Sequence, residues 1–166
     1  MLIKFMKSKT NVEINKLSDR SIDYLLKIFE LGGYENNVKI GVLANELNLA
    51  KPTVSLTTKK LVKKGLLEYT EYGRIRLTQK GMEIVYELLW RHGVLELAFH
   101  RLGLSTEESC FMARKVQSRV PRELVEKLWI LLGLPNKCCH DIEFPSPNQV
   151  NKDKNCLLYT SPSPRD

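Results

Sequence analysis

The sequence has no long apolar run, no secretion signal and few cysteines. No stretch approaches the roughly 20 consecutive apolar residues of a membrane-spanning helix, which excludes an integral membrane protein. The segment Met1–Met6 is too short and too lightly flanked by charge to be a signal peptide. Because no signal is expected, the four cysteines predict reduced thiols or metal ligands rather than a disulfide framework. We therefore expect a cytoplasmic protein that makes no membrane contact.

Catalytic motifs are also missing. The sequence contains no glycine-rich phosphate loop, no Gly-x-Ser-x-Gly nucleophile elbow and no zinc-protease helix motif. We therefore expect that the chain is not an enzyme. Hydrophobic residues make up 43% of the sequence and charged residues 27%, a composition that excludes disorder for most of the length.

The positive charge is concentrated in the first half of the chain. Residues 1–80 carry 15 basic and 8 acidic side chains, whereas residues 81–166 carry 11 of each. The whole net charge of +7 therefore belongs to the first half. A basic half joined to a neutral half indicates that the first half meets a polyanion and that the second has another role.

Hydrophobic spacing predicts a mainly α-helical chain with a small β-wing. Three helices are expected between residues 19 and 64, and the third has Pro52 in its first turn, where a missing N–H costs nothing. Two short strands, Leu66–Tyr72 and Arg74–Leu77, follow on either side of Gly73. Three further helices are expected: Thr78 to about Leu102, one opened by a capping box of Ser105 with Glu108, and Arg122–Leu132.

This order of elements predicts four regions. They are a flexible arm (1–18), a winged helix-turn-helix domain (19–80), a helical domain (81–147) and a disordered tail (148–166). Within the tail, residues 156–166 read CLLYTSPSPRD, which resembles the conceptual translation of a transposon-type sequencing adapter. We therefore predict that residues 156–166 are an artefact; the alternative is an ordinary tail rich in serine and proline.

The third predicted helix carries a basic outward face. Residues 51–64 contain five lysines and no acidic residue, and with Val54 directed inward most of these lysines point away from the core. In a helix-turn-helix the second helix enters the major groove of DNA, where an outward Leu56 can touch a thymine methyl group. The predicted DNA-binding residues are Lys51, Pro52, Thr53, Ser55, Leu56, Lys59 and Lys60 on this helix, with Arg74 and Arg76 on the wing. The alternative is a solvated lysine face on an ordinary helix.

Several sequence motifs occur in one consistent order along the chain. They are AKPTVS (50–55), KLVKKGLLEY (60–69), RLTQKG (76–81), WRH (90–92), GLP (133–135) and CCH (138–140). Together, from Ser21 to Pro147, they resemble the iron- and manganese-dependent repressors of the diphtheria-toxin-repressor type. The resemblance implies a winged helix-turn-helix domain followed by an α-helical dimerisation and metal-sensing domain. It also implies a homodimer that binds a palindromic operator in double-stranded DNA.

The resemblance assigns a primary metal site to four positions of this chain. Asp23 provides the carboxylate expected on the first helix, but the other positions fall on Arg114, Gln117 and Ser118. A guanidinium cannot bind a metal, serine is a poor ligand, and glutamine offers only a neutral oxygen. We therefore predict that Asp23 is a remnant of a broken primary site. One hypothesis is that Arg114 has replaced the cation and pairs with Asp23.

The ancillary site that the resemblance implies is better preserved. His92 and Glu96 lie four residues apart on a predicted helix, so their side chains point the same way, and the third position falls on Cys110. Imidazole, carboxylate and thiolate suit Zn²⁺, Fe²⁺ or Co²⁺. The alternative is a helix-surface pair beside a small buried cysteine.

A second cluster of possible ligands follows the last predicted helix. Cys138 and His140 flank Cys139, and Cys110 could join them if the last helix folds back. Such a set would bind Zn²⁺ or an iron–sulfur cluster, and the adjacent thiols could respond to oxidants. The alternative is a loop with ordinary thiols.

The function predicted from these patterns is a DNA-binding transcriptional regulator of metal homeostasis. It would be a repressor controlled by bound Fe²⁺, Mn²⁺ or Zn²⁺. Two alternatives stay open: a regulator of the same fold that responds to redox state or another ligand, and a winged-helix module that binds protein.

Overall fold

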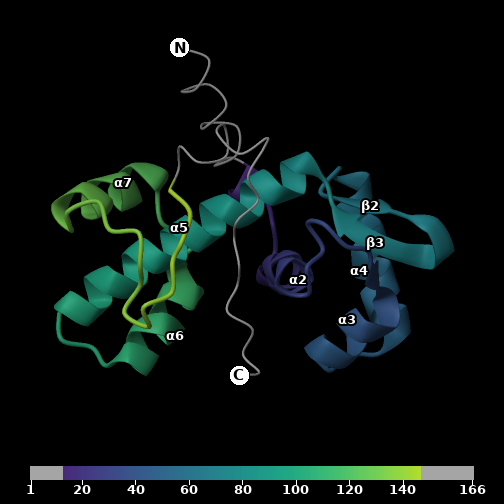
Figure 1. The fold of residues 1–166 in the computed structure, drawn as a ribbon, viewed down its shortest axis with the longest axis horizontal. Coiled ribbons are helices and arrows are strands. Elements are labelled where there is room, and N and C mark those ends of the chain that lie inside the picture. Colours follow the sequence, from purple (N-terminus) through teal and green to yellow (C-terminus); the bar gives the residue numbers. More distant parts are fainter. Residues whose placement is uncertain (1–12, 147–166) are drawn as a thin grey trace, which may run out of the picture. The chain divides into compact units, whose positions relative to one another are not determined.

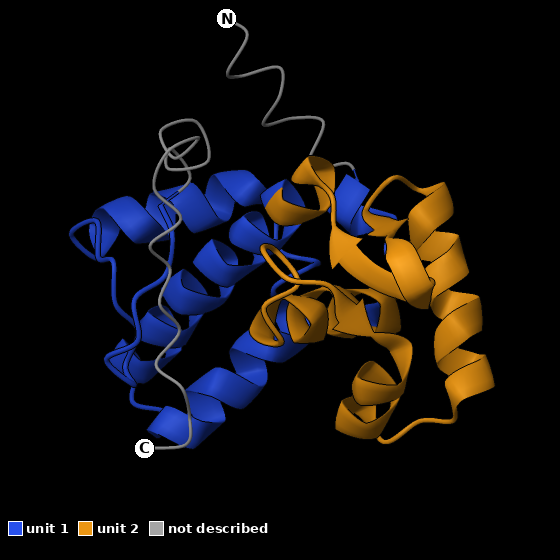
Figure 2. Ribbon diagram, turned by 45° about the vertical axis from the view of Figure 1, so that its right-hand side comes forward, with its two compact units in different colours: residues 1–19, 83–147 blue, residues 20–82, 148–166 orange. Residues whose placement is uncertain are grey.

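The computed structural model describes residues 13–146 of the chain (Figure 1). Within this range, residues 20–82 form one compact unit, the winged-helix unit, and residues 13–19 with 83–146 form another, the α5–α7 unit (Figure 2). The architecture is mainly α-helical with one small antiparallel sheet, which confirms the predicted fold class. Residues 1–12 of the predicted arm and the predicted tail lie outside the described residues. No helix in the described part of the chain has the length and apolar character needed to cross a membrane.

The winged-helix unit contains the three predicted helices and the predicted hairpin in their predicted order, with an additional short strand before the second helix. These are α2 (Asp19–Glu30), β1 (Val38–Lys39), α3 (Ile40–Leu47), α4 (Lys51–Lys63), β2 (Leu67–Tyr69), the 3₁₀ turn η1 (Glu71–Gly73) and β3 (Arg74–Leu77). The strands are antiparallel in the order β1-β3-β2, and β3 in the centre pairs Ile75 with both Val38 and Tyr69. The sheet therefore joins the chain before α3 to the hairpin after α4.

Helices in this unit bury the apolar positions that the spacing predicted. Ile22 and Leu25 on α2 are buried, as are Val54, Thr58 and Leu61 on α4, which confirms the inward side predicted for that helix. The Thr58 hydroxyl donates a hydrogen bond to the carbonyl of Val54 at 2.7 Å, so a buried polar group is satisfied inside the helix. The opposite side of α4 is left to solvent.

The wing differs from the prediction at its tip. The first strand was predicted to reach Tyr72, but β2 ends at Tyr69 and η1 forms the turn. Tyr72 has φ 60° and Gly73 has φ 66°, and two consecutive residues in the left-handed region cannot continue an extended ladder. The side chain of Tyr72 is consequently 93% exposed.

The α5–α7 unit is built on α5 (Gln79–Arg101) from residue 83 onward, with α6 (Thr106–Val116) and α7 (Arg122–Leu131). The predicted capping box begins α6: the Ser105 hydroxyl accepts from the Glu108 N–H at 3.2 Å, and the Glu108 carboxylate accepts from the Ser105 N–H at 2.9 Å. The buried core of this unit contains Trp90, Val94, Val125 and Phe144.

The segment after α7 returns to α5. Phe144 packs against Gly93 so closely that a Cβ at Gly93 would lie 2.2 Å from the Phe144 ring. An antiparallel bridge between Lys137 and Glu143 closes the segment on itself. Residues 138–140 therefore lie beside α5, where the yellow-green end of the ribbon passes that helix (Figure 1).

A buried network of charged side chains connects α5 with α7. Arg91 is fully buried and pairs with Glu87 at 3.1 Å. Arg122 pairs with Glu87 and, at 3.1 Å, with Glu126, and its guanidinium lies 4.9 Å from the centre of the Trp90 ring. Arg91 also donates to two backbone carbonyls beyond the end of α6. The network thus connects α5 with both other helices of the unit.

Candidate functional site

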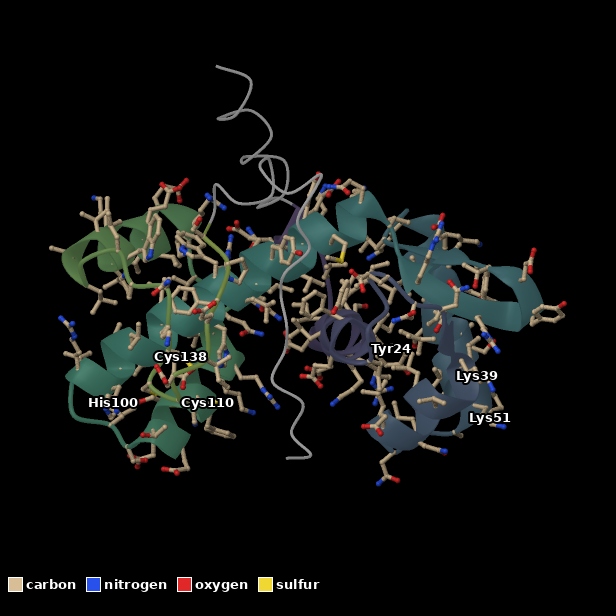
Figure 3. The ribbon with its side chains drawn as sticks, in the orientation of Figure 1. Tyr24, Lys39, Lys51, His100, Cys110 and Cys138 are labelled. Atoms are coloured by element: carbon tan, nitrogen blue, oxygen red, sulfur yellow. The ribbon has the colours of Figure 1, made fainter. Side chains whose placement is uncertain are left out.

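The outward face of α4, here called the α4 surface, is basic. Its exposed side chains are Lys51, Pro52, Thr53, Leu56, Lys59, Lys60 and Lys63, and Ser55 is half-buried. Leu56 is 58% exposed, so its side chain is accessible on this surface. Figure 3 labels Lys51 where α4 begins. The predicted DNA-binding residues of this helix thus share one surface whose charge complements a phosphate backbone.

The wing places its two predicted DNA-binding arginines differently. Arg76 is exposed, but its guanidinium pairs with the carboxylate of Glu68 on the neighbouring strand. Arg74 is half-buried at the start of β3. The residue that projects furthest from the turn is Tyr72, which the sequence reasoning missed because its exposure depends on the turn geometry.

Three side chains that could ligate a metal ion meet between α5 and α6. His92 and Glu96 come from α5 and Cys110 from α6, as predicted. The His92 Nε2 atom lies 3.3 Å from Glu96 Oε2 and 3.6 Å from Cys110 Sγ. Tetrahedral zinc bonds of about 2.0–2.1 Å to N and O and about 2.3 Å to S give separations of about 3.3 Å for N–O and about 3.6 Å for N–S. The two distances from His92 Nε2 therefore match those of a tetrahedral site, and the three ligand atoms lie within 4.8 Å of one another.

The other carboxylate oxygen of Glu96 faces a second group. Cys139 donates its thiol hydrogen to Glu96 Oε1 at 2.9 Å, and His140 Nδ1 lies 2.5 Å from the same oxygen. Glu96 itself is only 1% exposed. Side chains from α5, α6 and the returning segment therefore meet at one buried carboxylate. We call this group the Glu96 cluster; it consists of His92, Glu96, Cys110, Cys139 and His140.

Burial and hydrogen bonding shift the acidity of this cluster. Burial raises the pKa of Glu96, but hydrogen bonds from His92 and Cys139 and the charges of His92 and His140 outweigh it, and the pKa falls to about 2. Burial, followed by the charge of Glu96, raises the pKa of Cys110. Burial and the hydrogen bond to Glu96 raise the pKa of Cys139 to about 12. The carboxylate is thus ionised at neutral pH, and a metal must displace the proton of any thiol that it binds.

Cys138, a predicted ligand, lies near the same carboxylate, and its role as a ligand stays a prediction. Its sulfur accepts a hydrogen bond from the His140 N–H at 3.4 Å, and its side chain packs against the buried core of the α5–α7 unit. Burial raises the pKa of Cys138. Cys139 instead donates to Glu96, and no pattern in this irregular segment indicated which thiol would do so. Figure 3 labels Cys138 and Cys110 on the same side of this unit.

The residues assigned to the primary site by resemblance are divided between the two units. Asp23 is exposed on α2 in the winged-helix unit, whereas Arg114, Gln117 and Ser118 belong to the α5–α7 unit. The pairing of Asp23 with Arg114 stays a prediction. Gln117 is only 3% exposed, and its Oε1 atom lies 2.9 Å from His92 Nδ1, a contact that sequence reasoning missed.

Two protein families match adjacent parts of the chain. Residues 16–75 match the family described as "Iron dependent repressor, N-terminal DNA binding domain". Residues 78–146 match "Iron dependent repressor, metal binding and dimerisation domain". The two matches follow each other with almost no gap, so they cover nearly all of the described residues.

Similar proteins carry related descriptions. An uncharacterised HTH-type transcriptional regulator of Methanocaldococcus jannaschii is 33% identical over 66% of this chain and 90% of its own length. The HTH-type transcriptional regulator MntR of Geobacillus kaustophilus is 31% identical over 51% of this chain and 60% of its own length. This chain therefore spans nearly all of the first relative and somewhat more than half of the second.

Solved structures share the fold. A hypothetical protein from Sulfolobus solfataricus has a TM-score of 0.69 and 29% identity, with 78% of this chain and 100% of that chain covered. ScaR with bound Zn²⁺ has a TM-score of 0.67 and 30% identity, with 76% of this chain and 60% of that chain covered. The chain belongs to the iron-dependent repressor family and is a metal-responsive, DNA-binding transcriptional regulator.

Proposed function

We propose that this regulator is a repressor of metal homeostasis that binds its controlling ion at His92 Nε2, Glu96 Oε2 and Cys110 Sγ. The observation that carries this proposal is the spacing of the three atoms, 3.3 Å and 3.6 Å from the histidine nitrogen, which matches the edges of a tetrahedral site. Three protein ligands leave a fourth position for water. A bound ion would supply a positive charge that joins α5 to α6.

The donor set favours Zn²⁺ or Fe²⁺ over Mn²⁺. A thiolate and an imidazole are softer ligands than the carboxylates that manganese prefers. Cys139 and His140 would hold the second oxygen of Glu96, which orients the carboxylate toward the ion. The predicted loss of the primary site supports placing the ion here, because a guanidinium occupies one of that site's predicted ligand positions.

The α4 surface would bind double-stranded DNA in the cytoplasm. Its lysines would contact phosphates, while Thr53, Ser55 and Leu56 near the start of the helix would meet base edges. On the wing, Arg74 and Tyr72 would extend this surface, whereas the charge of Arg76 is balanced locally by its partner on β2.

A homodimer would present two such surfaces to a palindromic operator. The matched dimerisation domain indicates the homodimer, and the α5–α7 unit exposes large apolar side chains that a second copy would cover. Examples are Leu102 at 79%, Ile130 at 63% and Leu131 at 80% exposure. The half-sites would then lie about 34–36 Å apart, one turn of the DNA double helix.

Thiol acidity disfavours the redox-sensing alternative. Cysteines that sense oxidants have a lowered pKa and are open to solvent, because the thiolate is the reactive form. Here burial raises the pKa of Cys110, Cys138 and Cys139. The same three thiols become good ligands once a metal displaces their protons.

Fluorescence anisotropy tests the proposal. A duplex would first be selected from a random-sequence pool on the Zn²⁺-loaded protein, and its affinity measured with chelator, Zn²⁺, Fe²⁺ or Mn²⁺. We expect Zn²⁺ or Fe²⁺ to raise the affinity at least about tenfold over chelator, which corresponds to about 1.4 kcal/mol. The variants Glu96→Gln and Cys110→Ser should bind DNA weakly under every condition. Equal affinity with chelator and with every metal would refute metal control through this site.

A further inference from the structure

Gln117 lies directly beside the metal-binding histidine. It follows α6 as its C-cap residue, and its side-chain Oε1 lies 2.9 Å from His92 Nδ1. Its backbone is also fixed, because its N–H donates to the carbonyl of Ala113 at 2.9 Å and its own carbonyl accepts from Arg91 at 3.3 Å. Two neighbouring residues of α5 thus contact one buried glutamine: Arg91 contacts its backbone carbonyl and His92 contacts its side-chain amide.

The chemistry of a metal-bound imidazole explains why this contact matters. A neutral imidazole carries one proton, so a ring that binds an ion through Nε2 must carry that proton on Nδ1 and donate it to an acceptor. Gln117 Oε1 lies at hydrogen-bond distance from Nδ1, while Nε2 faces Glu96 and Cys110. The amide oxygen is therefore positioned to select the tautomer and the ring orientation that metal binding needs.

We infer that Gln117 is a positioning residue of the metal site, which accepts the Nδ1 proton of His92 and directs the Nε2 lone pair toward the ion. This inference rests on the proposed function. The resemblance assigned Gln117 to the primary metal site. Here Gln117 instead supports the ancillary metal site. A neutral amide at this buried position supplies the acceptor for the histidine proton without adding a charge.

Two substitutions at this position separate the proposed role from simple packing. Gln117→Met keeps the length of the side chain but removes the strong acceptor, whereas Gln117→Glu restores an acceptor. Both leave the backbone contact with Arg91 in place, because that contact uses the carbonyl of residue 117. Zn²⁺ affinity would be measured by competition with a chromophoric chelator, and the protonation of His92 by ¹⁵N NMR of histidine-labelled protein.

We expect Gln117→Met to lower the Zn²⁺ affinity about 10–100-fold, the usual effect of removing the partner of a ligating histidine. Gln117→Glu should recover most of that loss and should keep a slowly exchanging Nδ1–H signal in the Zn²⁺-bound protein. The double variant His92→Ala/Gln117→Glu is the control that shows whether the new carboxylate binds Zn²⁺ by itself. If the Zn²⁺ affinity also recovers in this double variant, the inference is overturned.

The outcomes distinguish this inference from the function on which it rests. If Glu96→Gln and Cys110→Ser leave Zn²⁺ binding unchanged, the proposed metal site itself is wrong. If those two variants lose Zn²⁺ while Gln117→Met binds it as tightly as the wild type, only the role of Gln117 is overturned. Equal losses in Gln117→Met and Gln117→Glu, with the Nδ1–H signal unchanged, would likewise show that the residue acts through packing alone.

Discussion

Replacing Gly93 with alanine tests how the returning segment is held against α5. Helix propensity alone predicts that Gly93→Ala stabilises the protein by about 1 kcal/mol, because alanine is the better helix former. The structure predicts the opposite sign. An alanine Cβ would lie 2.2 Å from Cδ1 of Phe144 and 2.6 Å from both Cε1 and Cγ, whereas carbon atoms pack at about 3.5–4.0 Å.

The size of the effect follows from where Phe144 can move. The ring is 8% exposed and belongs to the core with Trp90 and Val125, so a retreat of more than about 1 Å must displace other core side chains. Overpacking of this kind costs about 1–3 kcal/mol, and expulsion of the ring would cost about 1.5–3 kcal/mol of apolar burial. After the gain in propensity of about 1 kcal/mol, we expect a net destabilisation of up to about 2 kcal/mol.

Urea denaturation followed by circular dichroism measures this change. Gly41→Ala is the matched control, because its Cβ would lie 3.2 Å from the flexible end of the Lys51 side chain, so we expect it to be neutral or stabilising. Phe144→Leu should relieve the clash, and the double variant with Gly93→Ala should show a coupling energy of about 0.5–3 kcal/mol. A Gly93→Ala protein at least as stable as the wild type would refute the reasoning.

Three further changes probe the α5–α7 unit. Glu87→Gln should cost about 3–5 kcal/mol in urea denaturation, because the two buried guanidiniums of Arg91 and Arg122 would lose the carboxylate that they share; an unchanged midpoint would contradict the network. Ser105→Ala should cost about 1 kcal/mol by removing the acceptor that begins α6, and Ser105→Asp should retain most of the stability. Zn²⁺ at 100 times its dissociation constant should stabilise the protein by about 2.7 kcal/mol, and chelator should reverse this; a thermal shift that survives in Glu96→Gln would place the ion elsewhere.

Much of the fold was predictable because its signals are local. The helix spacing, the proline in the first turn of α4 and the capping box at Ser105 each depend on residues within one or two turns. The inward side of α4 was predicted for the same reason. In contrast, β1 has only two residues, and its strand pairing is with Ile75 and Arg74 far along the chain, so no periodicity reveals it.

The candidate metal site was predictable only in part. His92 and Glu96 lie four residues apart on one helix, which directs both side chains the same way, so the sequence predicted their contact. Residues 138–140 lie in irregular chain, where no periodicity fixes the direction of a side chain, so the sequence did not indicate that Cys139 donates to Glu96. The contact of Gln117 with His92 joins two helices, and the resemblance pointed away from it by assigning Gln117 to another site.

From the residues at the two candidate sites we expect one controlling ion in each chain rather than two. A primary site at the positions given by resemblance would need Gln117 as a ligand, but its amide oxygen already lies at hydrogen-bond distance from His92. The neighbouring position, Arg114, supplies a permanent positive charge that repels a cation. At the Glu96 cluster, by contrast, an ionised and buried carboxylate lies within 4.8 Å of two sets of nitrogen and sulfur ligands. We therefore expect the Glu96 cluster, rather than the predicted primary site, to hold the ion, because an amide oxygen of Gln117 that bonds His92 is not available as a ligand.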